Sequence, residues 1–516
     1  MNALVPRNTD HVTGVLSGWD RLVFRGTLRM LAFAGGMARY LSRMGILLKD
    51  FGDHAQAMTD RLVQASLKRA EAAGRPVRYL ASPSVRKDDY ARRIAQEDGI
   101  AEGLICVLTC VEPCRSFDIY RNRQEKRLEL VARHRKCKFL YHYWIDRRFG
   151  FMSARVQSWF PFSLQVCMNG REWLARRMNE KGISYTRYDN SFPWIDDFPK
   201  AQSIFDGMLK TDWPRTLDAA ARQVHPAHGA MFHGLGFHYY WSAFQTEWAT
   251  DTVFDSPRAL AAIYPQLVRG AIAAFNSRAA MRFLGHRLYK NHEGQIVSDY
   301  RDRPEGVCVK HRAVGNSIKV YDKGGSILRI ETTINNPRAY RSYRSSESEP
   351  EGPKQWRVMR RGVADMHRRA EVSQDANDRY AEALASLDTT TPLGELAAAV
   401  CRPVSKDGKR CRALRPFSPE DRALLEAISD GKHATEGFCN RDLASRLYPA
   451  QSTDRTARSR IASKVSYRLR ILRAHGLIRK VPRQRRYHMT TKGRQIATAL
   501  LQAQHATLQQ LNSLAA

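Results

Sequence analysis

The chain lacks the features that mark membrane and secreted proteins. Its most apolar helical stretch, Leu260 to Phe275, is interrupted by Arg269, whereas a membrane span needs about 20 largely apolar residues. The first residues, MNALVPRN, do not combine a basic start with an apolar run, so no secretory signal is expected. The sequence therefore predicts no membrane association and a cytoplasmic location.

Acidic residues are also scarce. Lys and Arg number 84 against 51 Asp and Glu, which gives a formal net charge of +33. The imbalance is greatest in residues 402–494, which hold 24 basic and 8 acidic residues. Surfaces of this kind attract phosphates. The expected partner is double-stranded DNA, with RNA as the alternative. The composition gives no indication of oligomeric state.

Cysteine is infrequent and unevenly spaced, with nine residues in 516, which suits a reducing compartment. Cys106, Cys110, Cys114 and Cys137 are conceivable zinc ligands, but their spacing matches no common zinc template. They border an apolar, strand-like run, so we expect buried thiols. Glycine-rich phosphate loops and His-Glu-x-x-His are absent, so ATP-driven work is not expected.

Hydrophobic periodicity predicts a multidomain α+β protein with a central mixed or antiparallel sheet, helical insertions and a C-terminal winged helix-turn-helix. We expect the following regions: an N-terminal α/β region at 1–115, a basic antiparallel sheet region at 116–195, a helical region at 196–290, a strand-rich region at 291–345, a helix with a basic linker at 346–416, and a winged-helix domain at 417–516.

The winged-helix prediction depends on the long helix expected from Asp454 to His475. Ile461, Val465, Leu469 and Leu472 fall on one face of it. A basic hairpin follows, and only one acid accompanies twelve Lys and Arg between Asp454 and Arg486. Hydroxyls, Tyr and Arg can reach phosphates and base edges. The candidate DNA-binding residues are Arg455, Ser459, Arg460, Ser463, Tyr467, Arg470, Arg483, Arg485 and Arg486.

Residues 472–496, LRAHGLIRKVPRQRRYHMTTKGRQI, resemble the winged-helix DNA-binding domain of MarR-like transcriptional regulators. The resemblance covers roughly residues 417–503 and implies DNA binding. It does not imply regulation, because the same module occurs in replication initiators and transposases. The long N-terminal part resembles an uncharacterised bacterial protein, which implies no function.

The best candidate for an active site is SIKVYDK at 317–323 followed by LRIETT at 328–333. Asp322 and Glu331 on two adjacent strands would bind Mg²⁺ or Mn²⁺ through oxygen. Tyr340 and Tyr343 are candidate nucleophiles towards a phosphodiester. The stretch "YDK…LRIE" is weakly similar to rolling-circle replication initiators, which nick DNA with a tyrosine. The paired-histidine metal motif of that family is absent here.

Two further carboxylate groupings are candidates for an acidic site. His142 and Asp146 are four residues apart on a predicted strand and so share a face, where they would extend a metal site or form an ordinary polar pair. Glu247 and Asp251 are four apart on a predicted helix. For these two, an Arg partner explains a buried carboxylate at least as well as a metal.

The leading functional hypothesis is a DNA-binding protein of a mobile element or replication system, with metal-dependent strand cleavage by a nickase- or transposase-like nuclease. The alternatives are a non-enzymatic winged-helix transcriptional regulator and an RNA-binding protein. Residues 115–155 carry twelve basic and four acidic residues on predicted strands and turns. They are the candidate for a second nucleic-acid surface.

Overall fold

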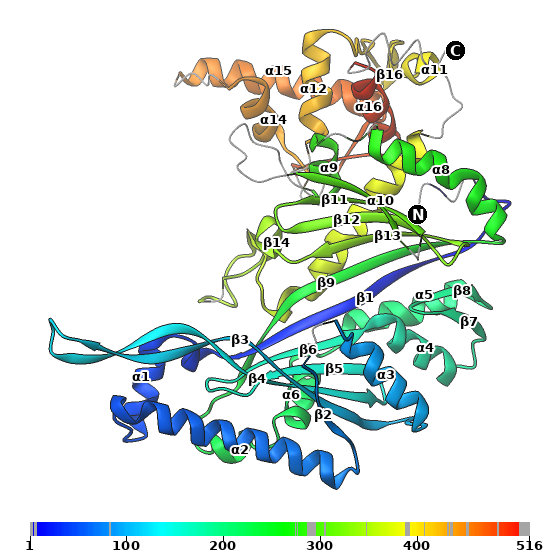
Figure 1. Cartoon of the computed structure of the whole chain (residues 1–516). Helices are drawn as coiled ribbons and strands as arrows, with labels where there is room; N and C mark the ends of the chain where they lie inside the picture. Colours follow the sequence, from blue (N-terminus) through cyan, green and yellow to red (C-terminus); the bar gives the residue numbers. More distant parts are fainter. Residues whose placement is uncertain are drawn as a thin grey trace. The chain divides into compact units, whose positions relative to one another are not determined.

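The computed structural model shows a mixed α/β protein with a large mixed sheet and many helices (Figure 1). It describes residues 4, 8–81, 84–273, 275, 277–285, 296–303, 306–346, 348–387, 393–406, 408–430, 433, 437–449, 454–481 and 485–504. Two compact units are present. Unit 1 comprises residues 1–17, 248–358 and 368–516, and unit 2 comprises residues 18–247 and 359–367.

The two units interleave along the chain because two long strands belong to both. β1 (Val12–Leu28) and β9 (Tyr239–Phe254) each cross the boundary in mid-strand. Among the described residues, the large sheet has the strand order β10-β11-β12-β13-β9-β1-β6-β5-β4-β3-β2. Within residues 13–30 the sequence predicts only a short strand-like piece, GWDRLVFRG, whereas β1 has 17 residues.

Unit 2 places helices against the strands that follow β1. Its helices and strands are α1 (Ala34–Arg43), α2 (Phe51–Ala72), β2 (Val77–Tyr79), α3 (Lys87–Glu97), β3 (Gly103–Asn122), β4 (Arg127–Asp146), β5 (Gly150–Gln157), β6 (Ser163–Asn169), α4 (Gly170–Glu180), β7 (Tyr185–Tyr188), β8 (Ser191–Ile195), α5 (Phe198–Asp206), α6 (Trp213–Val224) and α7 (His228–Met231). β2 pairs in parallel with β3, and α3 lies between them in the chain. The predicted antiparallel pairing from residue 116 onwards is confirmed.

The strands of unit 2 have one apolar and one polar face, as the two-residue period of a strand requires. Phe24, Val166 and Ala154 lie in one row across β1, β6 and β5 and are buried. The next row, on the opposite face, contains Arg25, Gln165 and Arg155. The polar face therefore presents guanidinium and amide groups from three neighbouring strands.

β3 and β4 continue far beyond this sheet as a two-stranded arm, which projects from the rest of unit 2 in Figure 1. Their antiparallel register runs without a break from Cys106 opposite Tyr143 to Asn122 opposite Arg127. Most residues of the outer half are exposed or half-buried on both faces. The sequence predicts separate short strands here, because it does not show that their pairing is continuous.

In unit 1, helices pack against the strands β9, β13, β12, β11 and β10, which are neighbours in the sheet in that order. Its first elements are α8 (Pro257–Ala273), α9 (Ser277–Phe283), β10 (Val297–Arg303), β11 (Gly306–Ala313), β12 (Asn316–Lys323), β13 (Ile327–Ile334), β14 (Arg341–Arg344), β15 (Gln355–Val358) and α10 (Met366–Leu387). Leu267, Ile330 and Tyr380 are members of one buried cluster drawn from α8, β13 and α10. Within the strand-rich region expected at 291–345, residues 306–334 contain β11, β12 and β13.

The last part of unit 1 begins with α11 (Leu393–Ala398) and the hairpin of β16 (Val404–Lys406) and β17 (Lys409–Cys411). The C-terminal module, residues 417–503, then contains α12 (Pro419–Ile428), α14 (Asn440–Leu447), α15 (Arg455–Ala474), β18 (Ile478–Lys480), β19 (Tyr487–Met489) and α16 (Thr491–Ala503). Leu425, Leu443, Leu469 and Ile496 are members of one buried cluster. The core of the module extends to Val400 and Leu414 of the preceding segment.

The prediction of an all-helical region at 196–290 is wrong in its middle part. Residues 239–254 form the strand β9. Their aromatic, Thr and Val content favours a strand, but a short apolar run does not by itself distinguish a strand from a buried helix. Glu247 and Asp251 are therefore strand residues.

Candidate nucleic-acid interface and carboxylate cluster

α15 begins at an N-cap that the sequence supplies. The Asp454 carboxylate accepts hydrogen bonds from the backbone N–H of Thr456 at 3.2 Å and of Ala457 at 3.0 Å. A carboxylate also suits the positive end of a helix. Val465, Leu469 and Leu472 are buried in the core of the module, and Ile461 packs against it. The predicted apolar face is therefore confirmed.

The opposite face of α15 brings together most of the predicted DNA-binding side chains. Ser459, Arg460, Ser463, Tyr467 and Arg470 are all exposed. The Arg470 guanidinium lies 5.1 Å from the centre of the Tyr467 ring. α15 contains no acidic residue, and neither Arg460 nor Arg470 has a carboxylate partner in the described part of the chain. The side chain of Arg455 lies outside the described residues.

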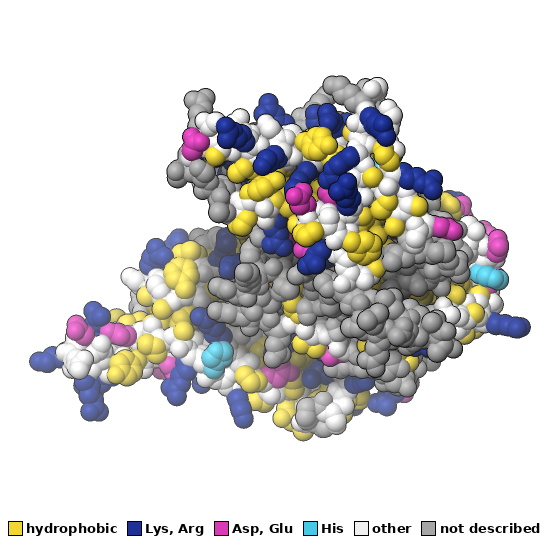
Figure 2. Space-filling view, turned by 90° about the horizontal axis from the view of Figure 1, so that it is seen from above, with side chains coloured by type: hydrophobic (Ala, Val, Ile, Leu, Met, Phe, Trp, Pro, Cys, Tyr) yellow, Lys and Arg dark blue, Asp and Glu magenta, His cyan; other side chains and the backbone are white. Residues whose placement is uncertain are grey.

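Of the three arginines assigned to the hairpin of β18 and β19, the two that the structure describes differ in their surroundings. Arg485 is exposed. Arg486 instead turns into the module, where its Nη2 donates to the Gly437 carbonyl at 3.0 Å and lies 3.8 Å from the Asp442 carboxylate. Arg486 therefore has a structural partner that sequence reasoning missed. Arg483 lies outside the described residues. On the face shown in Figure 2, Lys and Arg (dark blue) outnumber Asp and Glu (magenta).

The two faces of the β3–β4 arm differ in charge. On one face, Arg133 pairs with Asp118 and Arg127 pairs with Glu129, both at 2.9 Å. The register places no acidic residue on the other face, whose charged and titratable side chains are Arg115, Arg121, His134, Lys136 and Lys138. The positive charge predicted for residues 115–155 is therefore balanced by carboxylates on one face of the arm but not on the other.

The predicted metal pair of Asp322 and Glu331 is corrected by the strand register. Asp322 stands opposite Leu328, and Glu331 stands opposite Lys319. Because side chains alternate along a strand, the two carboxylates project from opposite faces of the sheet and cannot share an ion. The Asp322 carboxylate accepts from the Gly325 N–H at 2.8 Å in the following turn, and burial raises its pKa.

The two candidate tyrosines lie in different environments. Tyr340 is 3% exposed, and burial raises the pKa of its phenol well above the usual value. Both effects disfavour attack on a phosphodiester, so the structure argues against Tyr340 as a nucleophile. Tyr343 is 57% exposed on β14, and its ring centre lies 5.5 Å from that of Trp356 on β15. This packing describes an aromatic surface pair.

His142 and Asp146 belong to no group of three or more possible metal ligands among the described residues. His142 is buried, and desolvation, with a smaller contribution from the Arg69 charge, lowers its pKa to about 3. Asp146 caps the β4–β5 turn, where its Oδ1 accepts from the N–H of Arg148 at 2.8 Å and of Phe149 at 3.0 Å. The structure therefore shows His142 as a buried neutral imidazole and Asp146 as a cap of the turn, rather than as an extension of the predicted metal site.

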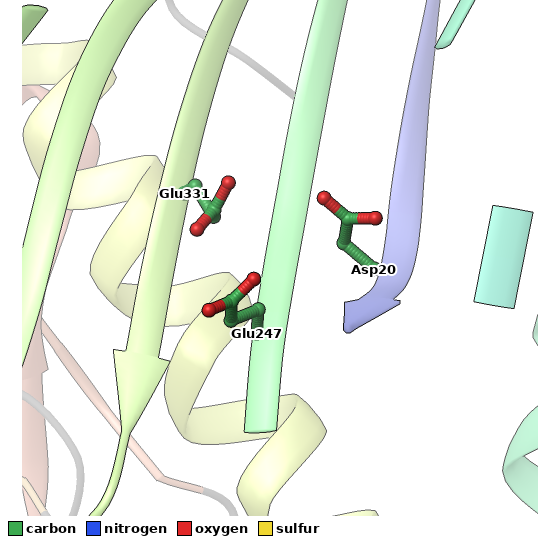
Figure 3. Close-up of side chains that lie close together, drawn as sticks. All are labelled: Asp20, Glu247 and Glu331. Carbon is green, nitrogen blue, oxygen red and sulfur yellow. The ribbon is translucent and has the colours of Figure 1, made fainter. Parts of the chain in front are cut away.

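Glu331 instead lies beside two carboxylates that sequence reasoning did not connect with it. Asp20 on β1, Glu247 on β9 and Glu331 on β13 come from neighbouring strands, and one oxygen of each lies within 4.8 Å of the others (Figure 3). Asp20 and Glu331 are 2% and 1% exposed. No other group of this kind occurs in the described part of the chain.

Hydrogen-bond donors and the Lys319 ammonium contact the three carboxylates. Asp20 accepts from Nδ2 of Asn169 at 2.8 Å and of Asn190 at 2.7 Å. Glu247 accepts from Gln245 Nε2 at 2.5 Å. The Lys319 ammonium lies 3.0 Å from Glu331 Oε1, and the Tyr321 hydroxyl donates to Oε2 at 3.1 Å. At an effective dielectric constant of about 20, each close carboxylate pair repels by roughly 3 kcal/mol. A divalent cation would relieve this repulsion.

The described residues contain no helix with the length and hydrophobicity that a membrane span requires. Comparison with family models, curated proteins and solved structures found no match for this chain.

Proposed function

We propose that the C-terminal module is a winged-helix domain that binds duplex DNA, within a protein of a mobile element or replication system. In the described residues, the order α12, α14, α15, hairpin and α16 matches that of a winged helix-turn-helix, with α15 as the helix that enters the major groove. The main support for this proposal is the outer face of α15, which has no acidic residue. On this face, Arg460 and Arg470 have no carboxylate partner among the described residues.

The competing explanation for this face is ordinary solvation. It predicts weak binding to any polyanion without preference for a duplex. A recognition helix instead places hydroxyls and guanidinium groups against base edges and phosphates. Ser459 and Ser463 have small side chains and would permit close approach. A regulator and an RNA-binding protein remain the alternative functions.

The test is binding of full-length protein to duplex DNA, single-stranded DNA and duplex RNA over a range of salt concentrations. The logarithm of the association constant for duplex DNA should fall linearly with the logarithm of salt concentration, because phosphate contacts release counterions. The double variant R460Q/R470Q should bind at least about tenfold more weakly.

R422Q is the matched control. Arg422 is also an exposed arginine of the module, but it pairs with Glu426 at 3.3 Å on α12. This variant should stay within about twofold of the original affinity, in line with a surface ion pair. Equal losses in both variants would reduce the effect to net charge. Preferential binding of duplex RNA would favour the RNA alternative.

The carboxylate cluster favours a second activity. We propose that Asp20, Glu247 and Glu331 hold Mg²⁺ or Mn²⁺ and support hydrolysis of a phosphodiester. Carboxylate oxygens are the ligands that these cations prefer. A bound divalent ion polarises a phosphoryl oxygen and assists attack by water. Lys319, 3.0 Å from Glu331, supplies a positive charge for a phosphate group.

The test compares E331Q with E371Q in full-length protein. Glu371 is an exposed carboxylate on α10, paired with Arg368 at 2.7 Å. E331Q should abolish Mn²⁺-dependent cleavage of plasmid DNA and weaken Mn²⁺ binding measured by electron paramagnetic resonance. E371Q should retain both properties. Equal Mn²⁺ binding by the two variants would exclude the cluster as the ion site.

A further inference from the structure

Unit 2 contains a cavity of about 290 Å³ on the polar face of its sheet. Arg25, Arg155, Gln157 and Gln165 contribute to its lining from β1, β5 and β6, and a segment of β3 that includes Cys114 and Ser116 borders it. Phe117, Phe139 and Phe162 supply apolar walls. The volume exceeds that of a single water, roughly 30 Å³ in the liquid, several-fold. The cavity can therefore hold a small molecule or one unit of a polymer.

Three strands place two of the guanidinium groups on either side of one amide. Arg25 on β1 stands opposite Gln165 on β6, and Gln165 stands opposite Arg155 on β5. Neighbouring strands are about 4.8 Å apart, so the backbones of the two arginines are separated by roughly 10 Å. Side chains of that length can converge on one ligand from opposite sides.

The positive charge of the cavity exceeds the negative charge beside it. Arg155 is neutralised by Glu112, to which its Nε and Nη2 donate at 3.0 and 2.5 Å. Arg25 has no carboxylate partner in the part of the chain that the structure describes. Burial lowers the pKa of Arg25, and the charges of Arg155 and Arg361 lower it further. The arginine side chains of the cavity therefore carry more positive charge than the Glu112 carboxylate neutralises.

The contacts of Arg25 leave its donors available. Its guanidinium lies over the Phe244 ring, 4.3 Å from the centre. Such stacking uses the face of the guanidinium, while the N–H groups point outward in its plane. Those donors can form a two-pronged contact with two oxygens of an anion.

A rigid wall borders these donors. Gln157 Nε2 donates to the carbonyls of Arg115, Trp159 and Pro161 at 3.2, 2.9 and 2.9 Å. The Ser163 hydroxyl donates to Gln157 Oε1 at 3.2 Å. The segment between β5 and β6 is thereby fastened to β3. A preformed wall lowers the ordering cost of binding a ligand.

We infer that this cavity is a phosphate-binding site, with Arg25 as the principal ligand and Arg155 as a supporting one. Guanidinium forks match phosphate oxygens better than they match a spherical anion. The aromatic walls suit the sugar or base attached to that phosphate. The bound group is a nucleotide unit, either free or within a nucleic-acid strand. This inference does not depend on the proposed functions of α15 or of the carboxylate cluster.

The experiment titrates full-length protein with inorganic phosphate, adenosine 5′-monophosphate, adenosine, and a single-stranded tetranucleotide with and without a 5′-phosphate, using calorimetry. Phosphate-bearing ligands should bind, and adenosine should not. Binding of the free nucleotide identifies a nucleotide site, whereas binding of only the tetranucleotides identifies a strand site. Absence of binding by every phosphate-bearing ligand would overturn the inference.

Variants place the binding in the cavity. R25Q should weaken the binding of phosphate-bearing ligands at least about tenfold, as expected for loss of a charged hydrogen-bond donor, and R25K should weaken it less. R29Q is the matched control, because the Arg29 guanidinium also stacks on a ring, 3.8 Å from the centre of Tyr240, but does not line the cavity. R155Q changes a second guanidinium of the cavity lining and provides another test should R25Q misfold. Equal affinities in R25Q, R155Q and R29Q would refute the assignment.

Discussion

Arg329 and Asp251 form an ion pair that is closed to solvent. The Arg329 Nε and Nη2 donate to the two carboxylate oxygens of Asp251 at 2.6 and 2.8 Å, and the side chains are 0% and 2% exposed. The Arg partner considered for Asp251 on sequence grounds is therefore confirmed. The pair connects β13 to β9 within unit 1 and gives both groups the hydrogen bonds that buried charges require.

Removing one partner of this pair should destabilise unit 1 strongly. D251A leaves a buried guanidinium without its counter-ion, which typically costs about 3–5 kcal/mol. Urea unfolding followed by tryptophan fluorescence measures the loss. The control is D118A, because the Asp118–Arg133 pair is exposed and exposed pairs contribute about 1 kcal/mol or less. Similar effects of the two substitutions would contradict the buried role of the Arg329–Asp251 pair.

Arg485 and Arg486 are adjacent but should respond differently to substitution. R485Q should lower duplex affinity a few-fold for all sequences, because an exposed wing arginine mainly contacts phosphate. R486Q should lower the melting temperature of the full-length protein, because it removes the hydrogen bond to the Gly437 carbonyl. Gel-shift assays and calorimetry measure the two effects. The distinction is wrong if R485Q lowers the melting temperature as much as R486Q.

The β3–β4 arm should extend the contact with nucleic acid. A two-stranded ribbon fits the major groove of duplex DNA. Replacing Arg121, Lys136 and Lys138 by Gln removes three charges from the acid-free face of the arm and should shorten the nuclease footprint. Replacing Arg127 and Arg133, which have carboxylate partners, should change it less. Identical footprints in all three proteins would restrict the arm to another role.

Acid should destabilise unit 1 through His311. Its ring nitrogens contact the Ser298 hydroxyl at 2.7 Å and the Tyr380 hydroxyl at 3.0 Å, and burial lowers its pKa to about 4. In the unfolded chain the pKa is near 6.5, so between these values the unfolded state binds more protons. The stability contribution is complete above pH 6.5 and is lost as the pH falls towards 4.

The size of this effect follows from linkage. A depression of this size corresponds to about 3 kcal/mol across the interval, at 1.36 kcal/mol per pKa unit. H311Q retains hydrogen-bonding groups but cannot titrate. Its free energy of unfolding should depend less steeply on pH between 4 and 6.5 than that of the original protein. Parallel pH profiles would show that His311 does not contribute.

The sequence alone determined the local features of the protein. The cap at Asp454, the apolar face of α15 and the three strands from 306 to 334 follow from short-range patterns that the structure retains. The charge composition also predicted a basic surface, because charges can be counted without knowledge of tertiary contacts. These features depend on residues a few positions apart, where periodicity is informative.

Only the tertiary structure decided which distant residues meet. Asp322 and Glu331 are close in sequence, yet the register of β12 with β13 directs them to opposite faces. Asp20 and Glu247 are far from Glu331 in sequence but lie beside it, because β1, β9 and β13 are neighbouring strands. Strand order arises from long-range pairing, which leaves no local periodic signal in the chain.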